Sequence, residues 1–103
     1  MLHLLLTPIL QTAVIKEALR LSFGVPGRLP RVVPEPGAMF NGYFVPPGTI
    51  VGMSSWLMHR NPEIFPNPLN FDPERWLDPQ NFRRLDRHMV PFGRGSRQCV
   101  GMP

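Results

Sequence analysis

The cysteine Cys99 lies in a glycine-rich run, residues 92–101, with the sequence Phe-Gly-Arg-Gly-Ser-Arg-Gln-Cys-Val-Gly. Three glycines within nine residues let the backbone turn tightly and bring several amide N–H groups towards one point. Amides directed at a sulfur stabilise the thiolate over the thiol, and Arg97 adds positive charge nearby. A thiolate held in this way serves as a nucleophile or as an axial metal ligand. Nucleophilic use normally requires a histidine base, and His88 is available for it.

Three patterns along the chain point to one known family. The spacing Phe-x-x-Gly-x-Arg-x-Cys-x-Gly in residues 92–101 resembles the heme-binding signature of the cytochrome P-450 family, the heme-thiolate monooxygenases, with every fixed position filled. The run Glu17–Arg20 is similar to the Glu-x-x-Arg of the family's K helix, and Asp72–Trp76 is similar to the Pro-Glu-Arg-aromatic segment of its meander. The patterns stand in the family's order, and the resemblance covers roughly residues 11–103.

The resemblance implies that Cys99 is the proximal ligand of a heme iron, and therefore both the metal ligand and a cofactor-binding residue. Thiolate ligation pushes electron density onto the iron and favours O–O cleavage. Phe92 is implied to pack against the loop and the ring, and Arg97 to pair with a heme propionate. Arg28, after the K helix, resembles a second propionate partner and His59 a third, with a surface turn as the alternative for His59.

The pair Glu17 and Arg20 is expected to fasten the cysteine loop to the rest of the chain. Residues three apart are neighbours on one helix face, and in the family this pair and Arg75 form a buried ion-pair cluster that holds the heme-loop region against the K helix. Buried charges need every partner, because removing one strands the others. The alternative is an exposed pair, which contributes little to stability.

The first element that positions these residues is a helix predicted over residues 8–23. Thr7 and Pro8 favour a helix start, apolar residues follow at helical spacing, and Gly24 favours its end. The apolar run Met1–Leu10 does not continue the family pattern well. It is shorter than the roughly 20 residues of a membrane span and lacks the features of a signal peptide. We therefore expect no membrane span in this chain and an intracellular location.

Strands and irregular chain are predicted after this helix. Residues 31–53 favour short strands, with Asn41–Gly42 as the type I′ turn of a hairpin. A short helical turn is expected from Ser54 or Ser55 to His59. Residues 62–91 are rich in proline and are predicted to form an irregular meander whose large apolar side chains need burial.

Composition limits the fold. The 14 Pro and 9 Gly among 103 residues exclude a helical bundle or a coiled coil, whereas 43% hydrophobic and 10% aromatic residues are typical of a globular chain. A single cysteine excludes an internal disulfide and a multi-thiolate metal site. The resemblance implies a mainly α fold with a minor β-sheet, of which residues 1–103 would form one partial, loop-rich α+β domain.

The net charge of +4 arises in residues 83–97, where five arginines stand against Asp86. A nucleic-acid-binding protein would be expected to spread this charge over a face with stacking aromatic side chains, so a solvated loop or a docking patch for an acidic partner is favoured. The resemblance implies that a NADPH-dependent reductase or another electron donor docks on the face beside the thiolate. The basic residues implied in this docking are Arg83, Arg84, Arg87 and Arg94.

The resemblance implies a fragment of an enzyme that inserts one atom of O₂ into a small organic substrate. The family's distal oxygen-activating residues have no counterpart here, so no catalytic residue is assigned, and we expect the isolated chain to bind heme poorly and to be inactive. Residues 58–65 resemble fungal members of secondary metabolism, and a full-length eukaryotic parent would lie at the endoplasmic reticulum membrane. The alternative is a non-catalytic remnant without heme, acting as a basic interaction segment. A heme-responsive regulatory site usually has proline after its cysteine, where Val100 stands here.

Overall fold

The longest element of the computed structural model, which describes residues 2–22, 24 and 26–101, is the helix α1 (Leu2–Leu21). It begins six residues before the predicted start at residue 8 and continues through Pro8. The leucine-rich first turns favour helix strongly enough to extend it beyond Thr7, and the hydroxyl of Thr12 donates to the Pro8 carbonyl at 2.8 Å. Among the described residues α1 ends at Leu21, and the predicted end at residue 23 lies outside them.

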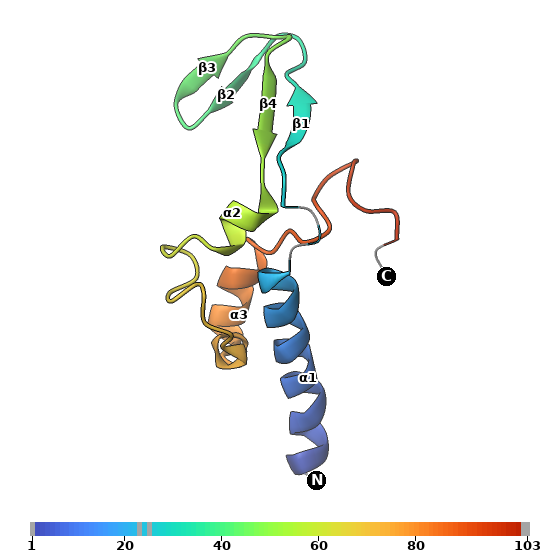
Figure 1. Ribbon diagram of the computed structural model, residues 1–103, viewed down its shortest axis with the longest axis vertical. Coiled ribbons are helices and arrows are strands. Elements are labelled where there is room, and N and C mark those ends of the chain that lie inside the picture. Colours follow the sequence, from blue (N-terminus) through green and yellow to red (C-terminus); the bar gives the residue numbers. More distant parts are fainter. Residues whose placement is uncertain (1, 23, 25, 102–103) are drawn as a thin grey trace.

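Four short strands form two antiparallel ladders at the opposite end of the molecule from the start of α1 (Figure 1). Strand β1 (Leu29–Val32) pairs with β4 (Ile50–Met53), and β2 (Ala38–Phe40) pairs with β3 (Tyr43–Val45). The turn between β2 and β3 lies where Asn-Gly predicts it, and φ is 48° at Asn41 and 84° at Gly42. Positive φ at both residues is what a type I′ turn requires.

Two helices and a 3₁₀ turn connect the strands to the cysteine loop. They are α2 (Ser55–His59), η1 (Pro73–Trp76) and α3 (Pro79–Asp86). The prediction of an irregular chain over residues 62–91 is wrong for η1 and α3. Each begins with an Asp-Pro pair in which the aspartate side chain accepts an amide N–H two residues on, 3.1 Å away for Asp72 and 3.3 Å for Asp78. Aspartate at the N-cap followed by proline is a helix-start signal.

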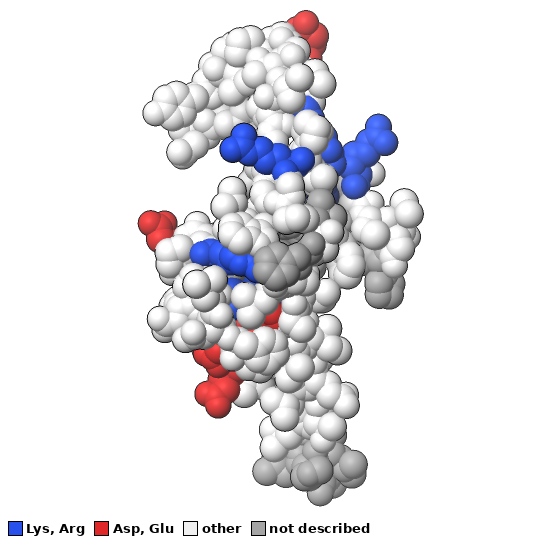
Figure 2. Space-filling view, in the orientation of Figure 1, with Lys and Arg blue, Asp and Glu red and all other residues white. Residues whose placement is uncertain are grey.

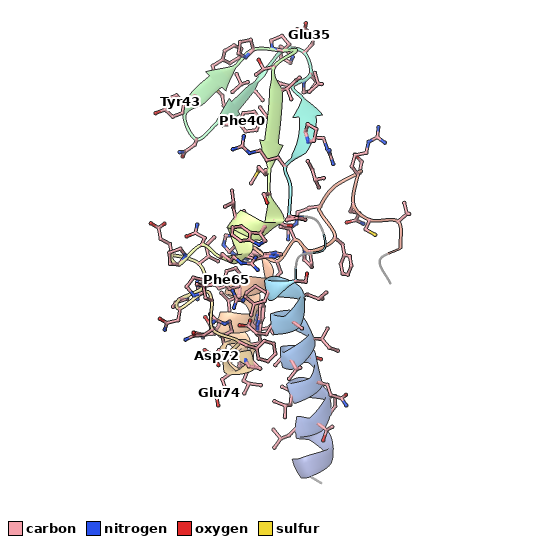
Figure 3. All side chains as sticks on the ribbon, viewed as in Figure 1. Glu35, Phe40, Tyr43, Phe65, Asp72 and Glu74 are labelled. Atoms are coloured by element: carbon pink, nitrogen blue, oxygen red, sulfur yellow. The ribbon has the colours of Figure 1, made fainter. Side chains whose placement is uncertain are left out.

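The hydrophobic core lies where α1 meets the meander and α3, and the strands contribute little to it. Its buried members come from α1, η1, α3 and the chain between them: Ala13, Phe65, Trp76, Leu85 and Met89. In contrast, Tyr43 is 74% exposed and Ile50 is 71% exposed. Figure 3 shows Phe65 among the packed side chains below α2, whereas Phe40 and Tyr43 lie on the hairpin far from this core. Within the described part of the chain, no helix is both long and apolar enough to cross a bilayer.

Candidate functional site

The carboxylate of Glu17 lies at the centre of a buried ion-pair cluster between α1 and η1. Arg20 donates to both of its oxygens, from Nε at 2.9 Å and from Nη2 at 2.6 Å. Nε of Arg75 and the backbone amide of Asp72 each donate to Oε1 at 3.0 Å. The indole N–H of Trp76 donates to Oε2 at 2.9 Å. The side chains of Glu17 and Arg20 are both 0% exposed, so the pair is not the exposed one considered as an alternative.

Other N–H groups of the two guanidiniums bind backbone carbonyls of residues 66–70, and Nη1 of Arg20 also binds the carbonyl of His59. Arg20 Nη1 donates to the carbonyl of Pro68 at 2.7 Å, and Nη2 donates to that of Asn70 at 3.0 Å. Arg75 Nη1 donates to the carbonyl of Pro66 at 2.9 Å. A chain segment without regular structure is thus held by two side chains that a single carboxylate orients.

Electrostatics at Glu17 favour its charged form. Burial alone raises the pKa of this carboxyl, because a low-dielectric environment disfavours the anion. Hydrogen bonds from Arg20, Trp76 and the Asp72 amide, together with the positive charge of Arg20, outweigh burial and hold the pKa below its ordinary value. Among the described residues, no buried side-chain nitrogen or oxygen lacks a hydrogen-bond partner. The cluster is therefore fully satisfied within this chain.

The histidine considered as a third propionate partner, His59, is buried. Its exposed fraction is 2%, and its Nε2 accepts the backbone N–H of Val90 at 2.9 Å. Burial, followed by the positive charges of Arg20 and Arg60, lowers the pKa of His59 to about 4. A neutral, buried ring whose Nε2 is already bonded does not suit a propionate partner, and it does not lie in a surface turn.

Backbone hydrogen bonds close the cysteine loop at its base. The amide of Cys99 donates to the carbonyl of Phe92 at 2.8 Å, and the amide of Gly93 donates to that of Val90 at 3.1 Å. Gly93 and Gly95 have φ of 76° and 87°, which residues with a Cβ rarely adopt. The loop leaves the helices as an arm towards the C-terminus in Figure 1, and Cys99 is exposed on it.

The residues predicted to contact heme are placed in two parts of the molecule. Phe92 is half-buried at the base of the loop, and Arg97 is exposed two residues before Cys99. Arg28 is exposed just before β1 and lies beside Gly52 of β4. The loop fits one face of a thiolate-ligated heme, because it offers an accessible thiol, an aromatic side chain and an exposed guanidinium for a carboxylate. Among the described residues, no group of three His, Cys, Asp or Glu side chains could hold a metal ion instead.

The four arginines predicted to dock a partner are all exposed. Two lie at the end of α3, one follows it and one lies in the cysteine loop: Arg83, Arg84, Arg87 and Arg94. Arg84 donates to Asn81 Oδ1 at 2.8 Å and to the Ile64 carbonyl at 3.3 Å. On the face in Figure 2, basic side chains lie across the middle of the molecule, and acidic ones lie at its top and on its left flank.

Sequence comparison assigns the family. The family model described as Cytochrome P-450 matches residues 7–103. The chain belongs to the cytochrome P-450 family. It is 52% identical over 90 residues to a cytochrome P-450 monooxygenase of Botryotinia fuckeliana. The aligned residues make up 87% of this chain and 17% of that relative. It is 49% identical over 100 residues to a cytochrome P-450 monooxygenase of Penicillium thymicola. These residues make up 97% of this chain and 22% of that relative.

A third relative is a tryptophan 6-hydroxylase of Fusarium equiseti, 52% identical over 94 residues, which are 90% of this chain and 18% of the relative. The chain spans about a fifth of the length of these cytochrome P-450 relatives. The resemblance stated from the three sequence patterns is therefore confirmed at the level of the family. The described residues form α-helices and two small antiparallel sheets, as expected for a partial α+β piece of this fold.

Sequence analysis missed several partners in this cytochrome P-450 chain. It did not anticipate that the Asp72 amide and the Trp76 indole bind Glu17, although both lie in the Pro-Glu-Arg-aromatic run. It also missed Lys16, which pairs with Asp86 of α3 and lies over the ring of Phe82, 5.5 Å from its centroid. The detectable signal was the helical spacing of Phe82 and Asp86, which places both on one face of α3.

Proposed function

We propose that this chain forms the thiolate side of the heme site of a cytochrome P-450 monooxygenase, with Cys99 as the axial ligand. The exposed Cys99 thiol in a loop constrained by glycines is the observation that supports this most directly. Bound heme supplies reductive activation of O₂, by which the family inserts one oxygen atom into a small organic substrate. In this proposal Phe92 packs beside the ring, and Arg97 and Arg28 hold its propionates by charge-assisted hydrogen bonds.

The ion-pair cluster has a separate part in the proposal. Glu17 orients Arg20 and Arg75, and these two hold the meander carbonyls. Residues 66–70, which the cluster holds, are followed by η1, α3 and then the cysteine loop, so the cluster fixes the segment from which the loop leaves. None of its three members is proposed to touch heme. Their contribution is to folding and to the position of the loop.

Hemin titration of the 103-residue chain, with Cys99→Ser as the matched control, tests the ligand. We expect weak binding, with a thiolate-type band in the reduced carbon-monoxide difference spectrum of the unsubstituted chain and no such band in Cys99→Ser. The serine variant keeps the size of the side chain and its exposure, so only the sulfur differs. Identical spectra for the two proteins would overturn the proposal and favour the non-catalytic remnant.

The proposal extends to an electron donor that docks on the basic residues of α3 and the cysteine loop: Arg83, Arg84, Arg87 and Arg94. All four are exposed, and the attraction between such a patch and an acidic surface weakens as salt rises. We propose that this partner is a NADPH-dependent reductase and that the parent protein lies inside the cell and, as a full-length eukaryotic member, at the endoplasmic reticulum membrane.

Binding of a soluble NADPH-dependent reductase to this chain tests the docking surface. Reversal of the four arginines to glutamate is expected to abolish the binding measured at low salt. Arg31→Glu is a suitable control, because Arg31 is an exposed arginine on β1, outside this group. Unchanged binding by the four-fold variant, or an equal loss in Arg31→Glu, would contradict docking at these residues.

A further inference from the structure

The amide of Val90 lies where α3 gives way to the cysteine loop. After the end of α3, the amides of His88 and Met89 still bond back to the carbonyls of Leu85, at 2.9 Å, and Asp86, at 3.2 Å. Val90 is next, and its N–H donates to Nε2 of His59 at 2.9 Å, across 31 positions of sequence. Pro91 follows and has no N–H. The His59 ring therefore binds the last backbone donor before Phe92.

Val90 also forms one side of the base of the loop. Its carbonyl accepts the N–H of Gly93 at 3.1 Å, and the carbonyl of Phe92 accepts the N–H of Cys99 at 2.8 Å. These two bonds set the direction in which the chain leaves Val90 and returns to Cys99. A displacement of the Val90 backbone would therefore also move Phe92, whose carbonyl binds the amide of Cys99.

The other side of His59 is fixed by the ion-pair cluster. Its carbonyl accepts Nη1 of Arg20 at 2.8 Å, and the next residue, Arg60, donates to the Leu21 carbonyl at 3.0 Å. The imidazole meets the ring of Phe65 edge-on, with centroids 6.4 Å apart and planes at 88°. The end of α2 is thereby tied to the end of α1, and the imidazole is left with Nε2 directed at Val90.

We infer that His59 is a positioning residue: Arg20 holds its carbonyl, Phe65 meets its ring, and its imidazole fixes the Val90 end of the Cys99 loop. Acceptance at Nε2 requires a neutral ring with its proton on Nδ1. Burial and the charges of Arg20 and Arg60 keep the ring neutral at neutral pH, because they hold its pKa near 4. The hydrogen bond stands without any ligand, and its effect on heme binding rests on the proposed function.

Amide hydrogen exchange at Val90 tests the inference directly. His59→Phe keeps a ring that can meet Phe65 but has no acceptor, whereas His59→Gln supplies an amide oxygen close to the position of Nε2. We expect exchange at Val90 to be about fivefold faster in His59→Phe and near the original rate in His59→Gln, since one such hydrogen bond is worth about 1 kcal/mol. The Phe82 amide, which donates to the carbonyl of Asp78 at the start of α3, is the internal control. Unchanged Val90 exchange in His59→Phe, or equal rates in both variants, would overturn the inference.

Nitrogen resonances of His59 in the unsubstituted chain decide the question even where a variant does not fold. The inference requires the tautomer protonated at Nδ1, and an amide resonance of Val90 that shifts together with the titration of His59. A ring protonated at Nε2 at neutral pH, or a Val90 resonance indifferent to the titration, would refute it.

Hemin titration then separates this inference from the proposed function. We expect His59→Phe to keep the thiolate-type band that depends on Cys99 but to bind hemin about fivefold more weakly, with His59→Gln restoring most of the affinity. Equal affinity in a folded His59→Phe variant would show that the loop does not need the His59 bond to hold heme. If the unsubstituted chain showed no band that depends on Cys99, the proposed function would be contradicted. The exchange result at Val90 would still hold.

Discussion

The ion-pair cluster and the cysteine loop differ in where their partners lie. Glu17 and Arg20 are fully buried, and their hydrogen bonds end on groups of this chain, between residues 17 and 76. Cys99 and Arg97 are exposed on an arm beyond α3. The cluster is therefore complete as an internal structure, whereas the loop presents its chemistry outward. The contacts that position the meander therefore lie inside this chain, whereas the proposed heme ligand is exposed.

Arg20→Ala should give the largest effect, because it removes one partner from the closed cluster. Glu17 would then be buried with fewer donors, and the carbonyls of His59 and Pro68 would lose the Arg20 donor. Loss of one partner from a buried ion pair costs about 3–5 kcal/mol, which would unfold a chain with so small a core. Urea unfolding followed by circular dichroism measures this.

Arg97→Ala is the matched control for that change in the exposed loop. A surface substitution of this kind usually changes stability by less than about 0.5 kcal/mol, so its unfolding curve should overlay that of the unsubstituted chain. Equal losses in Arg20→Ala and Arg97→Ala would show that the two regions do not differ in the way the structure indicates.

Acid should weaken the link between the two regions through His59. Its pKa is about 4 in the folded chain against 6.5 ordinarily, so below the ordinary value the unfolded chain binds a proton that the folded chain does not. Stability is thus present above about pH 6.5 and is lost as pH falls towards 4. Between about pH 7.5 and pH 5 the loss from this group is about 2 kcal/mol.

Unfolding free energies at these two pH values, compared with those of His59→Gln, isolate this contribution, because the amide does not titrate. The dependence on pH should be smaller in the variant by roughly that amount. A variant with the same dependence as the unsubstituted chain would assign the loss to other groups, among them Glu17, whose pKa is also lowered.

Short sequence patterns correctly predicted those features that depend on residues close together in the sequence. The type I′ turn follows from Asn41–Gly42, and the proximity of Glu17 and Arg20 follows from their spacing on a helix. The start of α1 and the presence of α3 differ from the prediction, because leucines favour helix up to and beyond Pro8 and because Asp-Pro pairs start helices within a proline-rich segment. The bond from Val90 to His59 could not be predicted, since it joins positions 31 residues apart through one ring nitrogen.

The substitution Gly93→Ala should lower the free energy of unfolding by less than protonation of His59 does, and it should act on the cysteine loop. The φ of Gly93 is 76°, and a Cβ there would lie 3.7 Å from Cα of Gln98, an ordinary contact. The strain therefore comes from the left-handed backbone and is worth about 1–2 kcal/mol. Gly27→Ala is the control, because nothing lies within 4 Å of its added Cβ. We expect weaker hemin binding in Gly93→Ala alone, and equal binding by both variants would show that the loop adapts without cost.

The smallest expected effect concerns Lys16 and Asp86, which join α1 to α3 at the edge of the core. The Asp86 side chain is 43% exposed and that of Lys16 is 28% exposed, so solvent screens their attraction and a coupling of about 0.2–1 kcal/mol is expected. A double-mutant cycle with Lys16→Met and Asp86→Asn measures it by urea unfolding. The coupling should fall towards zero in high salt, whereas the cost of Arg20→Ala should persist, because its partners are buried. If the coupling between Lys16 and Asp86 did not weaken in high salt, this pair would be shielded from solvent as the Glu17 ion-pair cluster is.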